Sequence, residues 1–198
     1  MKHFYKIIAL LLILCSIPIL TVSATSVEPV SSKPSIDVSY SDFTSNFTYY
    51  KNLSKNHGYI IYIDCTENDF TSLQDYISQN ASGADELVES ENTRGIYIPT
   101  AYWNVATQGA REINGSSAKA TLYSSKLFYG ATSYEIVIQN LDPTNLLFQG
   151  FEGLEFTCSV APGKTAYLYL DTKSADKEDA FYLAFYAPCY AYGYVGAA

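Results

Sequence analysis

The stretch from Phe181 to Val195 most strongly limits the folds open to this chain. Residues at its odd positions are apolar or small, and tyrosines stand at most of its even positions. A period of two residues places these two sets on opposite faces of a β-strand. One face therefore needs a hydrophobic core, while the other carries rings whose hydroxyl groups can stay hydrated. We expect a late strand of an antiparallel sheet, against which the rest of the chain packs.

Short alternating segments recur before this stretch and are separated by turn residues. Segments 153–160, 165–171 and 181–187 are joined by a Pro-Gly turn and a charged loop, a pattern that predicts a meander. Many short strands at this spacing predict a mainly β fold, a single antiparallel β-sandwich of jelly-roll or immunoglobulin-like type.

Two earlier segments depart from this pattern. One short helix is expected near residues 71–80, where Leu73, Tyr76 and Ile77 lie at helical spacing. The polar and aromatic residues 37–56 favour an edge strand or an ordered arm laid on the domain.

The first residues have the features of a secretory signal peptide. Lys2 and Lys6 precede the apolar run 7–20, and Val22 and Ala24 occupy the −3 and −1 positions of a cleavage site. The run is short for a membrane span, which needs about 20 residues. An uncleaved anchor stays open as the alternative, and it is the one membrane contact we expect. The short lysine-led segment favours bacterial export to the medium or the cell surface.

Cys15 raises the alternative of a lipoprotein signal. Leu14 precedes it, where such signals place a small residue, so lipidation is disfavoured.

The rest of the chain is predicted to form one acidic domain. After the signal (1–24), a Ser/Pro/Val-rich disordered leader is expected over 25–36 and the β-sandwich over 37–198. The net charge is −8, and it becomes −10 without the signal, which carries two lysines and no acidic residue. Such a surface argues against nucleic acid and anionic membranes as partners.

The sequence shows no catalytic signature. His57 is the only histidine after the signal and lies in a predicted turn, while Cys65 falls on the apolar face of the strand predicted over 59–65. Neither a nucleophile elbow nor a zinc-ligand set accompanies them. The chain also has 20 acidic residues, among which no carboxylate pair stands out. A non-catalytic role is therefore favoured, with a small secreted hydrolase as the alternative.

One loop has the composition of a weak calcium site. Asp64, Glu67 and Asp69 place carboxylates close together in sequence, and calcium takes six to eight oxygen ligands. The alternative is a solvated turn with helix caps. No other cofactor is predicted.

Three cysteines follow the signal, each at an apolar-face position of a predicted strand. A bridge between Cys158 and Cys189 is the candidate disulfide in an oxidising compartment. The alternative is that these two and Cys65 are buried thiols.

The tyrosines carry the strongest functional hypothesis. The chain has 19 of them, and Tyr182, Tyr186, Tyr190 and Tyr192 share a predicted outward face, with Trp103 as a further aromatic platform. Such rings suit sugar rings and protein contacts. The alternatives are a second buried face and cross-strand aromatic pairing. We expect an exported binding module for an extracellular protein or glycan. A surface protein that self-associates through an unpaired edge strand is the competing structural class.

The signal-peptide hypothesis predicts the first residue of the exported protein. When the full chain is expressed in a bacterial host, the exported product should begin at Thr25 or within a few residues of it. The intact mass of the exported protein checks this. A mass that still includes residues 1–24 would instead indicate an uncleaved anchor.

Overall fold

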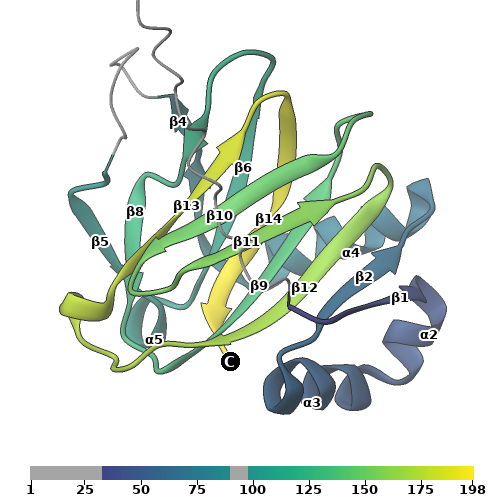
Figure 1. The fold of residues 1–198 in the computed structure, drawn as a ribbon, viewed down its shortest axis with the longest axis horizontal. Helices are drawn as coiled ribbons and strands as arrows, with labels where there is room; N and C mark the ends of the chain where they lie inside the picture. Colours follow the sequence, from purple (N-terminus) through teal and green to yellow (C-terminus); the bar gives the residue numbers. More distant parts are fainter. Residues whose placement is uncertain (1–32, 90–97) are drawn as a thin grey trace, which may run out of the picture. The chain divides into compact units, whose positions relative to one another are not determined.

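A computed structural model describes residues 33–89 and 98–198, apart from the side chains of Asn80 and Asp85. The predicted signal peptide and most of the predicted leader lie outside these residues. The first strand, β1, begins at Ser35, within the last two residues of the segment expected to be a leader. The fold is mainly β, as predicted, but it has two mixed sheets and several short helices (Figure 1).

The first sheet has seven strands and carries the candidate site. Its central strands β12, β9, β14 and β6 are antiparallel neighbours, whereas the outer pairs β1–β2 and β6–β3 are parallel. In spatial order the strands are β1 (Ser35–Ser39), β2 (Ile60–Asp64), β12 (Lys164–Asp171), β9 (Ser133–Asn140), β14 (Cys189–Ala197), β6 (Ala110–Ser117) and β3 (Ala81–Glu86).

The second sheet also has seven strands and is also mixed, because β5 and β8 pair in parallel. Its main path runs through β11 (Phe156–Val160), β10 (Leu146–Glu152), β13 (Phe181–Tyr186), β7 (Leu122–Tyr123) and β4 (Val88–Glu89). Beside this path, β8 (Lys126–Tyr129) pairs with β13 and with β5 (Ala101–Asn104).

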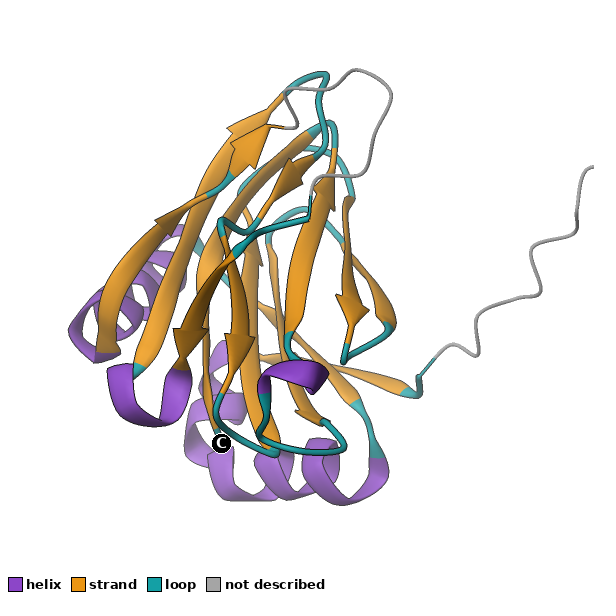
Figure 2. Ribbon diagram, turned by 90° about the vertical axis from the view of Figure 1, so that its left-hand side faces the viewer, coloured by secondary structure: helices purple, strands orange, loops and turns teal. Residues whose placement is uncertain are grey.

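The two sheets share one hydrophobic core. Residues at alternate positions of β9, β12 and β14 meet those of β10, β11 and β13, as the period of two predicted. Six of the odd-numbered residues from Phe181 to Val195 lie in this core: Phe181, Leu183, Phe185, Cys189, Ala191 and Val195. Figure 2 shows the strands as two layers with the helices outside them.

Three helices cover the outer face of the first sheet: α2 (Tyr40–Ser45), α3 (Phe47–His57) and α4 (Glu67–Asn80). Their apolar residues form a second core with the outward side chains of the sheet, including Phe43, Tyr50, Ile77, Ile61 and Val137. Two smaller elements, α5 (Val105–Gln108) and the 3₁₀ helix η1 (Lys177–Asp179), lie elsewhere in the chain. None of the helices in the described part of the chain is long and apolar enough to cross a membrane.

Local signals explain where these helices begin and end. The Ser39 side chain accepts a hydrogen bond from the backbone of Asp42 and caps α2. Thr66 and Asp69 form a capping box at the start of α4. Gly58, with a φ of 67°, ends α3 in the left-handed conformation that favours glycine.

The prediction of a single antiparallel sandwich with one short helix was wrong. Residues 37–56 form the end of β1 and then α2 and α3, rather than an edge strand or arm. Parallel pairing of β1 with β2 becomes possible because these helices return the chain to the same end of the sheet. The expected helix at 71–80 exists but begins earlier, at Glu67.

The predicted meander over 153–187 was also wrong. Strands β11 and β13 belong to the second sheet, whereas β12 between them pairs with β2 and β9 in the first. The alternation in sequence predicted correctly which face is apolar. It carries no information about which of two sheets a strand joins, because both sheets offer the same core.

Gly193 allows a close approach between β14 and β9. A Cβ atom at this position would lie 1.9 Å from the carbonyl oxygen of Val137. We expect Gly193→Ala to lower the free energy of unfolding by about 1–3 kcal/mol, because the strands would have to separate. Urea unfolding measures this change.

Gly163→Ala provides the control for that measurement. Gly163 has open space around it and a φ of 75°, so alanine there adds only backbone strain of about 1 kcal/mol. A smaller loss for Gly193→Ala than for Gly163→Ala would contradict the close approach of the strands.

Candidate functional site

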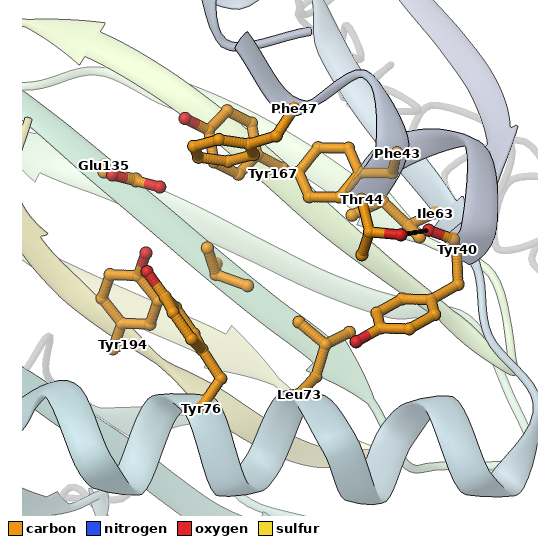
Figure 3. Close-up of a pocket in the computed structure, with 11 residues that line it drawn as sticks. Tyr40, Phe43, Thr44, Phe47, Ile63, Leu73, Tyr76, Glu135, Tyr167 and Tyr194 are labelled. Carbon is orange, nitrogen blue, oxygen red and sulfur yellow. Dashed lines mark hydrogen bonds between the residues drawn. The ribbon is translucent and has the colours of Figure 1, made fainter.

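A pocket of about 220 Å³ lies on the outer face of the first sheet, between α2 and α3 on one side and α4 on the other (Figure 3). Its floor comes from the strands and its walls come from the helices. Eleven residues line it, of which six are aromatic: Tyr40, Phe43, Phe47, Tyr76, Tyr167 and Tyr194.

One end of the pocket is apolar. Phe43 of α2 packs against Phe47 with ring centroids 5.5 Å apart and against Tyr167 at 5.4 Å. Leu73 of α4 and Ile63 of β2 complete this end. Phe47 and Tyr76 are 37% and 51% exposed, so the pocket opens to solvent between them.

The other end of the pocket is polar. Figure 3 shows the hydroxyl groups of Tyr76, Tyr167 and Tyr194 on the same side as the carboxylate of Glu135. The strand register explains this arrangement, because Tyr167 of β12 and Tyr194 of β14 both lie directly opposite Val137 of β9. Glu135 is two residues away on the same face, within reach of both long side chains.

Glu135 is a largely desolvated carboxylate. Its side chain is 12% exposed, and Lys51 of α3 approaches it with Nζ 3.8 Å from Oε2. That distance exceeds the 2.7–2.9 Å of a charge-assisted hydrogen bond, so the pair is loose. Lys51 is not among the residues that line the pocket.

The tyrosines at the polar end are held in their neutral form. Burial, and then the negative charge of Glu135, raise the pKa of Tyr167 and of Tyr194 well above the ordinary value. Tyr167 is 1% exposed, and its buried hydroxyl group makes no hydrogen bond of normal geometry. Such an unsatisfied group in a native structure calls for a functional or structural explanation.

The structure does not form the tyrosine row expected over Tyr182–Tyr192. The chain turns at Ala187 and Pro188, so β13 belongs to the second sheet and β14 to the first. Tyr182 is buried, Tyr186 and Tyr192 are half-buried, and Tyr190 is exposed.

The outward residues of the two strands have different neighbours. Tyr182 stacks on Phe151 in a small cluster outside the second sheet. Tyr192 packs at the edge of the helix-covered core of the first sheet. Burial and the charge of Glu112 raise its pKa to about 12.

Trp103 is not an open platform. The Arg111 guanidinium lies over its ring, 4.2 Å from the centroid, and the indole N–H donates to the carbonyl of Gly109 at 2.9 Å. The half-buried ring also packs against the core between the sheets. Its surroundings therefore match those of a structural side chain.

The candidate calcium loop is the beginning of α4. Asp69 accepts hydrogen bonds from the backbone and side chain of Thr66, and Glu67 lies in the first helical turn. Asp64 forms an ion pair with Lys164 at 3.1 Å. Within the described residues, no group of three or more His, Cys, Asp or Glu side chains is placed to hold a metal ion.

The predicted bridge between Cys158 and Cys189 is not formed, since both are free thiols. Cys158 lies on β11 of the second sheet and Cys189 on β14 of the first, and each is buried in the core as its position in the alternation predicted. Burial raises the pKa of Cys158 to about 12, which leaves it an unreactive thiol. Cys65 is half-buried and also free.

Sequence reasoning missed this pocket because it missed α2 and α3. A signal was present: Phe43, Phe47, Tyr50 and Ser54 are spaced at four, three and four residues, which is helical spacing, and Ser39 precedes them as a cap. The covering of the outer face of the first sheet by helices was not predicted.

The buried tyrosines predict a loss of stability at alkaline pH. Burial raises the pKa of Tyr62, Tyr134, Tyr167 and Tyr194 in the folded protein. Above about pH 10 the unfolded chain therefore loses tyrosine protons that the folded chain keeps, and the free energy of unfolding falls as the pH rises.

Urea unfolding across the alkaline range, together with tyrosinate absorbance, measures this effect. The fall in stability should coincide with the appearance of tyrosinate on unfolding. Tyrosines that all titrate near pH 10 in a still-folded protein would contradict the burial seen here.

Comparisons of this chain with known protein families, with curated protein sequences and with solved structures found no match. Among the described residues, the pocket combines one carboxylate with aromatic walls, as ligand sites commonly do.

Proposed function

We propose that this protein is an exported, non-catalytic binding module that holds a small amphipathic molecule in the pocket between α2, α3 and α4. The single observation that carries the proposal is the pocket itself, with apolar walls, a polar end and a buried Tyr167 hydroxyl that faces Glu135 without a hydrogen bond of normal geometry. Ligand sites commonly combine mostly apolar walls with a few convergent polar groups.

The size of the pocket limits the ligand. Sites for drug-sized ligands usually measure about 300–1,000 Å³. At about 220 Å³ this pocket fits a smaller molecule, such as one aromatic ring or a short alkyl chain with a polar group. An apolar body would contact Phe43 and Leu73, and its polar group would reach Glu135 and the tyrosine hydroxyls.

The proposed binding site differs from the tyrosine face that was expected from the sequence. Contacts with a glycan or protein through Tyr182, Tyr186, Tyr190 and Tyr192 would need these rings on one surface. They are divided between two sheets, and Trp103 is covered by Arg111.

The lining of the pocket gives no support to the alternative of a secreted hydrolase. It includes one carboxylate, Glu135, and neither histidine nor cysteine. Burial raises the pKa of Cys65 to about 11, which opposes its use as a nucleophile. His57 is exposed at the end of α3.

The alternative of edge-to-edge assembly through a tyrosine-rich strand is also weakened. The strands that carry the tyrosine alternation, β12, β13 and β14, each have a paired neighbour on both sides. They therefore offer no free row of backbone groups to another copy.

The proposed place of action outside the cytoplasm is supported by the sequence. The charged start, the apolar run 7–20 and the small residues ending at Ala24 are typical of secretory signals. An extracellular small molecule, or an extracellular partner that presents an amphipathic group, is the partner that we propose.

The test of the pocket uses a neutral probe, 2-phenylethanol, and a variant that narrows the entrance. Thr44 lines the pocket and is exposed, so Thr44→Trp should obstruct the pocket at little cost to folding. We expect the affinity for 2-phenylethanol, measured by NMR titration, to fall by about tenfold or more, equivalent to about 1.4 kcal/mol. Val137→Met, which extends the floor into the pocket, should act in the same direction.

Ser45→Trp is the matched control. Ser45 is the neighbouring exposed residue of the same helix and does not line the pocket. Its variant should bind the probe like the wild type. Equal binding by wild type, Thr44→Trp and Val137→Met, or no binding by the wild type, would refute the proposed function.

A further inference from the structure

We infer that the pocket selects a primary ammonium group carried on a small apolar body, with Glu135 as the anionic partner and the aromatic walls around the cation. This inference rests on the proposed function, because it names the class of ligand for the same pocket. It follows from the charge, the burial and the hydrogen-bonding capacity of the residues at the polar end.

Glu135 is a carboxylate that is largely buried and only partly neutralised by its neighbours. Glu135 lies on β9, an interior strand of the first sheet, and its side chain is 12% exposed. A buried charge is unfavourable unless it is paired and hydrogen-bonded. The Lys51 ammonium at 3.8 Å neutralises it only loosely, and the neighbouring hydroxyl groups of Tyr167 and Tyr194 are neutral donors that bring no positive charge. A ligand cation inside the pocket would supply a closer counter-charge.

The polar end of the pocket offers several hydrogen-bond acceptors to a ligand. A primary ammonium group has three N–H donors. The carboxylate of Glu135 can accept one or two of them, and the phenolic oxygen of Tyr167, which makes no hydrogen bond of normal geometry, can accept another. The ligand would thus give a normal hydrogen bond to a buried hydroxyl group that the protein alone holds only in a loose contact with Glu135.

The walls of the pocket are mainly aromatic and aliphatic. Six aromatic residues line the pocket, and the negative faces of such rings favour a cation over an anion in their surroundings. The aromatic and aliphatic side chains at the other end suit the apolar body of the ligand. An anionic ligand would instead meet the charge of Glu135 and the net charge of −8 on the chain.

Lys51 competes with the ligand for Glu135. It contacts this carboxylate from α3 but does not line the pocket. Removal of its charge should therefore strengthen the binding of a cation. This expectation separates an ion-pair mechanism from general apolar binding, which Lys51 would not affect.

The experiment compares three probes of similar shape and different charge: 2-phenylethylamine, 2-phenylethanol and 3-phenylpropanoate. NMR titration at neutral pH should give the tightest binding for the amine and the weakest for the carboxylate. In Glu135→Gln the affinity for the amine should fall by about tenfold or more, while that for the alcohol stays within about twofold. The thermal melting of this variant verifies that it is folded.

A second pair of variants keeps the test independent of Glu135→Gln. Lys51→Met should raise the affinity for the amine and leave that for the alcohol unchanged. The matched control is Lys55→Met, which removes the same charge one turn later on α3, where the ammonium lies over the ring of Tyr169. It should leave both affinities unchanged.

The outcomes distinguish this inference from the proposed function. Equal affinity for amine and alcohol, or unchanged amine binding in both Glu135→Gln and Lys51→Met, overturns the inference and leaves the pocket as a site for neutral ligands. Failure of all three probes to bind the wild type overturns both. A titration with a peptide that has one accessible lysine distinguishes two sources of the ammonium group. If the peptide binds more tightly than 2-phenylethylamine, the ligand is a lysine side chain of a protein partner. If it binds more weakly, the ligand is a free amine.

Discussion

The inward-facing row from Phe181 to Val195 is the constraint on which the rest of the structure depends. Its first half lies in β13 of the second sheet and its second half in β14 of the first, with the same parity on both sides of the turn at Ala187 and Pro188. One short stretch therefore contributes to both walls of the same core. Because that core is close-packed, the positions of the neighbouring strands follow from it.

The candidate site is a consequence of how the outer face of the first sheet is covered. The central strands of this sheet are apolar on much of both faces, so they need cover on the outer side as well. Helices α2 and α3 supply it over β2 and β12, and α4 supplies it over β14 and β6. The pocket lies between these two sets of helices, and the outward residues of β9 form its floor.

The buried tyrosines have two different roles in this arrangement. Tyr62 and Tyr134 belong to the core between the sheets, where their hydroxyl groups reach Cys158 and the backbone of Ala131. Tyr167 and Tyr194 stand on the opposite face, beside a carboxylate and a cavity. The second pair combines apolar contact area with hydroxyl groups at the buried polar end of the pocket, where the polar group of a ligand would lie.

The sequence by itself determined the mainly β class, the approximate boundaries of strands such as β12 and β13, and the residues of these strands that face the core. It also placed Cys158 and Cys189 in the apolar core. These features depend on the local period of two, which a single strand carries in its own residues. The spacing of Phe43, Phe47 and Tyr50 even contained the signal for the missed helices.

Only the tertiary structure decided which sheet each strand joins, and therefore which tyrosines are neighbours. Tyr182 and Tyr192 have equivalent positions in the alternation, yet one lies outside the second sheet and the other outside the first. The pocket likewise brings together residues from α2, α4, β9, β12 and β14 that are far apart in sequence. Strand partners and helix cover are set by long-range packing of the two cores, and alternation along a single strand is the same whichever partners it has.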